Sequence, residues 1–318
     1  MAYEDAFCWP VRRDAQSVRP LGEKGKPGMD NDTRRNFLKD FGLGAAALSI
    51  AGEGVRAGET GQAGQASPTG QGQMPGRPAI TESAGEAGAP PANIMAIAAH
   101  PGDAFFAMGA PVAVQTHRGG RGVFLSLSLG EKGSATITPA QYGQMQRLAS
   151  DRAALMLGAR ALFLDYPDGE VPANDEVKFA VCDVIRAQKP DVIVTHWRGS
   201  WHKDHQACYA VVSDAIFYAG LPAIAREDPA HNVAKLFFAD NWEDATDFAA
   251  DTYLDISDVF DRWIQACAVF PMWRGENGFR YNDYYTSLAV ERGCLGGFKQ
   301  AVALMSAPDQ LARRLHSL

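Results

Sequence analysis

Two short clusters of histidine and aspartate contain the residue types that bind a catalytic metal ion. His100 and Asp103 lie three residues apart, directly after the apolar run 94–99. The second cluster is the run 202–205, with the sequence His-Lys-Asp-His. Histidine nitrogens and carboxylate oxygens are ligands of catalytic zinc, which takes three protein groups and keeps one position open for water. The two clusters therefore predict a hydrolase that uses Zn²⁺ or another divalent metal.

Both clusters follow strands in a predicted alternation of strands and helices. The predicted strands are 94–99, 122–129, 161–164 and 190–196, and the predicted helices are 105–116, 141–157 and 176–188. The unbroken apolar run 94–99 is typical of a strand that is buried on both faces of a parallel sheet. This order predicts an α/β fold with an open, mostly parallel, Rossmann-like sheet and helices on both faces.

The predicted topology brings the two clusters together. Ligand sites in open α/β sheets lie just beyond the carboxyl ends of the strands. His100 follows the first strand, and His202 and His205 follow the strand that ends at His196. We therefore expect His100 and His205 to lie close enough to share one metal ion.

Five short motifs, in this order, resemble those of the LmbE/PIG-L family of zinc-dependent N-deacetylases. The motifs are Ala99-His100-Pro101-Gly102-Asp103, Gly130-Glu131-Lys132-Gly133-Ser134, Pro167-Asp168-Gly169-Glu170, Thr195-His196-Trp197 and His202-Lys203-Asp204-His205. The resemblance extends from about residue 93 to the C-terminus. It implies an LmbE-like fold in which His100, Asp103 and His205 bind the metal.

The resemblance also implies roles for residues around the metal. His202 would face the substrate, where it would stabilise the oxyanion or protonate the leaving amine, and Asp204 would hold that imidazole in its charged form. Asp204 also suits the N-cap of a helix. Arg147 and Asp168 match positions that bind the substrate sugar or shape the pocket. As isolated residues they are equally typical of an exposed helix arginine and a turn aspartate.

Gly102 is the main departure from the family pattern. In the family that the motifs resemble, this position is usually an aspartate, which takes the proton from the attacking water. Loss of a positioned general base costs roughly 10² to 10⁴ in rate. Three interpretations remain open: a base relocated to Asp204, Glu131 or Asp168, a slow enzyme that depends on its metal, or a catalytically impaired protein that binds metal and carbohydrate.

The predicted substrate is an N-acylated amino sugar or a similar small glycan, with acetyl as the expected acyl group. Trp201 precedes the second cluster and could form either a sugar-stacking surface or part of the core. The aromatic segment 270–285 is expected to form a lid over the site. The net charge of −7 and the absence of any lysine and arginine run exclude the electrostatic footprint of a nucleic-acid-binding protein.

The first 92 residues differ in composition from the remainder. Arg34 and Arg35 precede the apolar run 41–52, a pattern that resembles a bacterial twin-arginine export signal. This run is too short for a stable membrane span, so we expect an exported, periplasmic protein. We predict an export region at 1–53, a flexible linker rich in Gly, Ala, Gln and Pro at 54–92, and a deacetylase domain at 93–318. Met29 is a candidate start, and the oligomeric state stays open.

Overall fold

The computed structural model describes residues 90–308, which belong to one compact unit. The predicted export region and nearly all of the predicted linker lie outside these described residues. Within 90–308, no helix combines the length and the apolar character that a membrane crossing requires.

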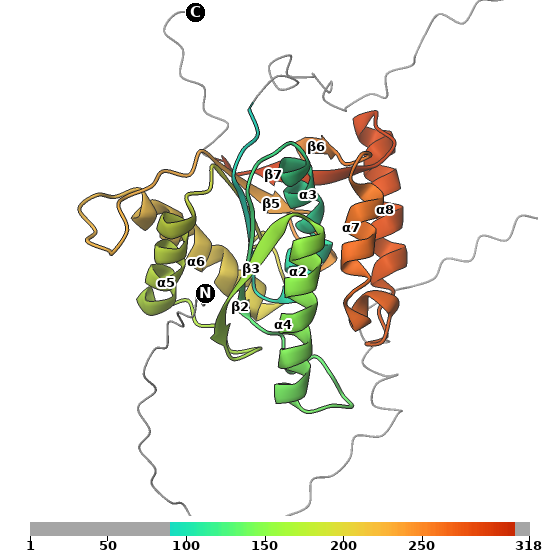
Figure 1. Ribbon diagram of the computed structural model, residues 1–318, viewed down its shortest axis with the longest axis horizontal. Coiled ribbons are helices and arrows are strands. Elements are labelled where there is room, and N and C mark those ends of the chain that lie inside the picture. The colour runs from blue at the N-terminus through green and yellow to red at the C-terminus, as the bar shows by residue number, and fades with distance from the viewer. Residues whose placement is uncertain (1–89, 309–318) are drawn as a thin grey trace, which may run out of the picture. The chain divides into compact units, whose positions relative to one another are not determined.

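Seven strands form one sheet in the order β3-β2-β1-β4-β5-β7-β6 (Figure 1). The strands are β1 (Ile94–Ala98), β2 (Gly122–Ser128), β3 (Ala159–Tyr166), β4 (Val192–Thr195), β5 (Lys235–Ala239), β6 (Thr252–Asp255) and β7 (Ala301–Ser306). β1 to β5 pair in parallel, whereas β7 runs antiparallel to both β5 and β6. The predicted α/β fold with an open, mostly parallel sheet is confirmed.

Helices cover both faces of the sheet (Figure 1). One face carries α5 (Asp175–Gln188) and α6 (Lys203–Ala219), and the other carries α2 (Pro101–Phe106), α3 (Gly109–His117), α4 (Pro139–Met156), α7 (Phe260–Cys267) and α8 (Tyr281–Gly296). Two short 3-10 helices, η1 (Trp242–Asp244) and η2 (Pro271–Arg274), follow β5 and α7. Along β1, Met95 and Ile97 pack toward α5 and α6, and Ala96 and Ala98 pack toward the other face. This two-sided burial explains the unbroken apolar run.

The predicted helix 105–116 is wrong in its extent, because this segment belongs to two helices, α2 and α3. Helix α2 begins shortly after β1, with Pro101 in its first turn. The regular helix is then interrupted at Ala107 and Met108, before α3 begins. In one continuous helix, Pro111 would remove a hydrogen bond to Ala107 and clash with its carbonyl. The restart at Gly109 places Pro111 in a first turn, where the missing N–H has no helical partner to lose.

The sheet reverses its winding direction at β1. From β1 the chain proceeds to β2 and β3 on one side, whereas β4 and β5 are added on the other side. Open α/β sheets bind ligands beyond the carboxyl ends of the strands at such a point. The segments that follow β1 and β4 are those that contain the two histidine clusters.

Candidate metal and catalytic site

Three side chains meet beyond the carboxyl ends of β1 and β4. Nδ1 of His100 lies 3.0 Å from Oδ2 of Asp103, and Nε2 of His205 lies 3.2 Å from the same oxygen. One ligand atom from each residue lies within 4.8 Å of the others. The two clusters thus come together at one sheet edge, as their positions after the strands predict.

Two helix N-termini position these side chains. His100 is the N-cap of α2, and Asp103 lies in its first turn, where the helix dipole favours a carboxylate. His202 is the N-cap of α6, with its Nδ1 accepting a hydrogen bond from the N–H of Asp204 at 3.2 Å. The N-cap is therefore His202 and not Asp204. This cap places His205 in the first turn of α6, facing the end of β1.

Asp244 fixes the orientation of the His205 imidazole. Its two carboxylate oxygens contact Nδ1 of His205 at 2.8 Å and Nδ1 of His196 at 2.7 Å. Nε2 of His196 accepts the N–H of Ala99 at 3.1 Å, so the proton of that ring sits on Nδ1. With its Nδ1–H donated to Asp244, His205 directs Nε2 toward Asp103. This Nε2 is buried and has no hydrogen-bond partner of good geometry among the described residues.

The carboxylates around His205 stabilise positive charge. Burial alone would lower the pKa of its imidazole, but Asp103 and Asp244 raise it to about 10. Burial would raise the pKa of Asp244, yet His196 and His205 hold it below its usual range. The carboxylates that stabilise positive charge on the His205 ring would also stabilise a divalent cation bound at its Nε2.

The second imidazole, His100, has the same kind of outer carboxylate. Its Nε2 lies 3.2 Å from Oδ1 of Asp168 and 3.4 Å from Oδ2 of Asp204, which leaves Nδ1 beside Asp103. The Asp204 carboxylate also accepts the N–H of Gly169 at 2.6 Å and that of Val171 at 3.3 Å. Imidazoles that bind metals commonly donate their other ring N–H to a carboxylate in this way.

This arrangement corrects the expected pairing of Asp204 with the His202 imidazole. The Asp204 carboxylate lies against His100, and only its backbone N–H contacts the His202 ring. Burial, followed by the nearby charges of His205 and His100, lowers the pKa of His202 to about 4. His202 is therefore neutral near pH 7, with its proton on Nε2.

The donor set of His100, Asp103 and His205 fits a zinc-type metal. Two imidazoles and one carboxylate supply three ligands, and the buried Nε2 of His205 makes no hydrogen bond with any described residue. Two other combinations of nearby donors fit less well. In the group of His196, His205 and Asp244, the atoms that face one another already form hydrogen bonds. In the group of His100, His202 and Asp204, the Asp204 carboxylate already accepts hydrogen bonds from backbone N–H groups.

A loop that sequence reasoning missed completes the site. After β5, Asn241 donates its side-chain N–H to Oδ1 of Asp103 at 3.1 Å, and Oε2 of Glu243 lies 3.4 Å from Nε2 of His205. Burial and the charge of Asp103 raise the pKa of Glu243 to about 7. The signal was present in the sequence, because the acidic run 240–244 follows the apolar run 236–239 as the first cluster follows β1.

A cavity of about 160 Å³ opens onto these groups. One wall, which we call the polar wall, contains His100, Asp103, Asp168, His202 and Glu243. A second part of the lining, which we call the corner wall, surrounds Met272 and contains Gly102, Phe106, Tyr142, Gln146 and Met272 itself. Gln146 is only 2% exposed, and its Oε1 has no hydrogen-bond partner among the described residues.

Met272 occupies the space beside Gly102. A Cβ atom added to Gly102 would lie 3.2 Å from Sδ of Met272 and 3.5 Å from Cε2 of Phe106. Met272 Sδ is itself contacted by the Tyr142 hydroxyl at 3.9 Å and by Nε2 of Gln146 at 3.8 Å. The space beside Gly102, where the family motif described above would place an aspartate, is thus filled by a thioether.

The remaining predicted site residues divide between the cavity and the surface. Asp168 lines the cavity, and its own N–H is bound by Glu131 at 2.9 Å, so the Glu131 carboxylate is already engaged. The Arg147 guanidinium pairs with Asp165 and lies 4.3 Å from the centre of the Phe163 ring. Arg147 does not line the cavity described above. Its neighbour in sequence, Gln146, does.

Comparisons with known proteins agree with this fold. Residues 95–216 match the PIG-L family model, described as GlcNAc-PI de-N-acetylase. The chain is 24% identical over 227 residues to a 4-oxalmesaconate hydratase of Pseudomonas putida, covering 69% of this chain and 85% of that protein. It is also 24% identical over 230 residues to a diacetylchitobiose deacetylase of Thermococcus kodakarensis, covering 68% of this chain and 83% of that protein.

A solved structure has the same architecture. The 4-carboxy-2-hydroxymuconate hydratase of Pseudomonas putida superposes with a TM-score of 0.64 at 22% identity, covering 71% of this chain and 99% of that one. At this level of identity the likeness concerns the fold alone. The match of residues 95–216 to the PIG-L family model confirms the resemblance drawn from the motifs.

Proposed function

We propose that this protein is a metal-dependent hydrolase that removes an N-acyl group, in the simplest case acetyl, from an amino sugar or a small glycan. The observation that carries the proposal is the meeting of His100, Asp103 and His205 beside a cavity that His100 and Asp103 line. In each imidazole, the ring nitrogen that points away from Asp103 lies against another carboxylate. The deacetylase of Thermococcus kodakarensis, which is named for an N-acetylated sugar, supports the choice of substrate.

His100, Asp103 and His205 would hold the cation. When bound, Zn²⁺ or a similar ion supplies Lewis acidity toward a carbonyl oxygen and brings the pKa of water near neutrality. Asp244 keeps the proton of His205 on Nδ1, and Asp168 with Asp204 keeps that of His100 on Nε2. Each imidazole therefore presents a lone pair on the nitrogen beside Asp103.

Glu243 supplies the carboxylate that Gly102 lacks. It lines the same cavity, and its Oε2 lies 3.4 Å from Nε2 of His205. A general base works best when its pKa lies near the working pH, and burial with the charge of Asp103 brings that of Glu243 to about 7. Glu243 can thus take a proton from water at Oε2 and return it to the leaving amine.

His202 and Gln146 would contact the substrate. The neutral His202 ring keeps its proton on Nε2, which can donate to the carbonyl oxygen as negative charge develops there. Oε1 of Gln146 is a buried acceptor without a hydrogen-bond partner in residues 90–308, so it favours a substrate with an amide N–H or hydroxyl donor. An N-acylated amino sugar carries both kinds of donor.

The hydratase relatives favour a second candidate reaction, the addition of water to a carbon–carbon double bond of an unsaturated acid. The same cation and the same carboxylate could serve it. Two features of the cavity count against a polyanionic substrate. Its lining includes Asp103, Asp168 and Glu243, and none of its lining residues is lysine or arginine.

One assay separates these candidates. Purified protein, with zinc or with a chelator, is incubated with N-acetylglucosamine derivatives and N,N′-diacetylchitobiose, and free acetate is measured. In parallel, loss of ultraviolet absorbance is followed with unsaturated dicarboxylic acids. We expect acetate release that needs the metal and disappears in His205→Ala. Hydration alone would favour the second reaction, and neither activity in a zinc-bound protein would favour the catalytically impaired alternative.

A further inference from the structure

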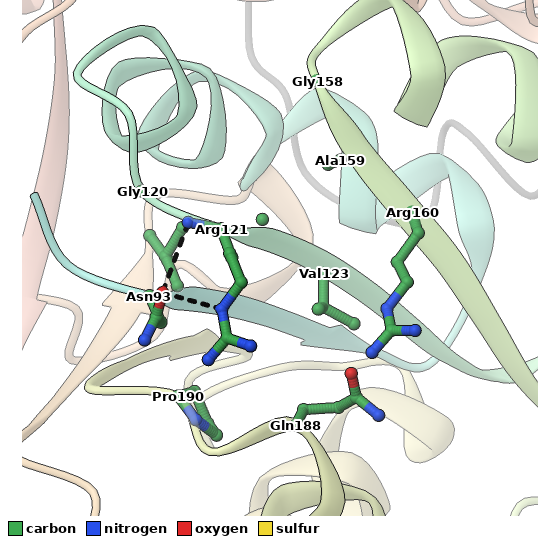
Figure 2. Close-up of a pocket in the computed structure, with 11 residues that line it drawn as sticks. Asn93, Gly120, Arg121, Val123, Gly158, Ala159, Arg160, Gln188 and Pro190 are labelled. Atoms are coloured by element: carbon green, nitrogen blue, oxygen red, sulfur yellow. Dashed lines mark hydrogen bonds between the residues drawn. The ribbon is translucent and has the colours of Figure 1, made fainter.

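A second hollow lies at the opposite edge of the sheet from the catalytic cavity. It has a volume of about 450 Å³ and adjoins the amino ends of β1, β2 and β3 and the end of α5 (Figure 2). This volume falls in the range of roughly 300 to 1,000 Å³ typical of small-molecule sites. The lining consists of Asn93, Ile94, Gly120, Arg121, Gly122, Val123, Gly158, Ala159, Arg160, Gln188 and Pro190.

The backbone explains why this edge is hollow. Small residues, Gly122 in β2 and Ala159 in β3, form the beginning of two neighbouring strands and are paired with each other. Helix α5 ends at Gln188, and Lys189 turns the chain away with a left-handed conformation, φ 52° and ψ 58°. No helix within residues 90–308 therefore covers the space between the end of α5 and these strand ends.

The guanidinium groups of Arg121 and Arg160 face this hollow, and none of the residues that line it carries a carboxylate. Oδ1 of Asn93 accepts a hydrogen bond from Nε of Arg121 at 3.1 Å, which orients the group and leaves its two terminal nitrogens without partners within 90–308. The Arg160 guanidinium has neither a hydrogen bond nor an ion pair within that range. Figure 2 shows both groups directed toward the side formed by Gln188 and Pro190.

An unpaired acceptor lies beside the two cations. Oε1 of Gln188 is buried and makes no hydrogen bond with any described residue. A buried acceptor without a donor is unfavourable, so a ligand that brings a hydroxyl would remove this cost. The hollow therefore offers two guanidinium groups that can bind an anion and one carbonyl acceptor for a neighbouring hydroxyl of the ligand.

We propose that this hollow binds a phosphate monoester of a small polyhydroxylated molecule. A guanidinium fork binds two oxygens at once, so two forks need more than the two oxygens of a single carboxylate. A phosphate monoester has three terminal oxygens and a charge near −2, which matches Arg121 and Arg160. The hydroxyl of the ester's organic part would donate to Gln188.

The site is separate from the proposed hydrolase chemistry. Its residues lie at the amino ends of the strands and at the end of α5, and none of them lines the catalytic cavity. Because both arginines are exposed, their replacement removes charge without opening the core. The proposal can therefore be tested whether or not the protein hydrolyses amides.

The test is calorimetric titration of the full chain with glycerol 1-phosphate at fixed ionic strength, in the presence of a chelator so that no metal recruits phosphate. Glycerol is the uncharged control, and glycerate tests whether a carboxylate can replace the phosphate. Inorganic phosphate shows how much the organic part of the ester contributes to affinity. We expect saturable binding of the ester at one site per chain, weakened at least about tenfold in Arg121→Gln and in Arg160→Gln. Gln188→Leu should weaken the ester but not inorganic phosphate.

Two controls make the result decisive. Arg152→Gln removes the same charge from an exposed position on α4 outside the hollow, and it should leave binding unchanged. His205→Ala should also leave binding unchanged, because it alters only the catalytic cavity. The proposal is overturned if the ester does not saturate, if glycerate binds as tightly, or if Arg152→Gln weakens binding as much as the two hollow arginines do.

Discussion

The two walls of the catalytic cavity differ in how they are built. At the polar wall and directly behind it, both proposed imidazole ligands have a carboxylate near each ring nitrogen, and these groups come from the segments after β1, β3, β4 and β5. On the corner wall, the place of a catalytic carboxylate is taken by Gly102 and the Met272 thioether. A family motif can therefore lose one functional side chain while a carboxylate from another loop, Glu243, faces the same cavity.

The largest effect on catalysis should come from Glu243→Gln. This change removes the proposed base and should lower kcat/KM by roughly 10² to 10⁴. A base must be ionised to accept a proton, so activity of the unaltered protein should fall as the pH drops through about 7, and Glu243→Gln should lose this dependence. Measurement of kcat/KM against pH, with zinc content determined in parallel, checks both points.

Glu276→Gln is the matched control, since this exposed glutamate pairs with Arg274 outside the cavity. An unchanged pH profile in Glu243→Gln would contradict the assignment of the base. Loss of bound zinc in that variant would instead make Glu243 a ligand.

Asp244→Asn should have the next largest effect, on metal affinity. The amide can no longer hold both His196 and His205 in one tautomer, and loss of such an outer partner typically costs about 10- to 100-fold in affinity. Competition titration with a zinc chelator measures it. Asp240→Asn, which alters a carboxylate paired with Arg292, should leave the affinity unchanged. Equal effects of the two variants would mean that Asp244 has no special role.

Gln146→Leu should lower kcat/KM for N-acylated sugars by about tenfold, because a donor of the substrate would be buried without an acceptor. The comparison is with Gln144→Leu, on the exposed side of α4. If Gln146→Leu left the N-acyl substrates unaffected, the corner wall would not recognise a donor. The hydratase candidate would then gain support.

The smallest effect on activity should come from Gly102→Asp. The new side chain would press against Met272, which should lower the free energy of unfolding by about 1 kcal/mol. With Glu243 present, kcat/KM should change little, whereas a protein without any base should gain activity. Thermal denaturation and acetate release measure the two quantities. A large gain in kcat/KM would contradict the proposed role of Glu243 as the general base.

The sequence predicts the first half of the sheet well and the second half poorly. The unbroken apolar run 94–99 and the helical periodicity of α5 both match the observed burial, because each element packs against the core along its whole length. β6 has four residues, none of them fully buried, so it lacks a periodic signal. The antiparallel pairing of β7 with β5 and β6 depends on contacts that are distant along the chain.

The same distinction holds within the site. His100, Asp103 and His205 follow recognisable strands, so the topology alone brings them together. Asp244 lies in a three-residue helix after a strand that the pattern did not reveal. Gln146 was missed in favour of Arg147, since one residue along a helix turns the side chain by about 100°. Gln146 shares a face with Tyr142, one turn earlier, and both are buried.

Zinc titration of the full chain tests the central claim most directly. We expect one equivalent of zinc to bind per chain, with binding lost in His100→Ala and in His205→Ala and retained in Glu243→Gln. If both histidine variants bound zinc as tightly as the unaltered protein, these residues would not share a metal ion, and the proposed hydrolase mechanism would be contradicted.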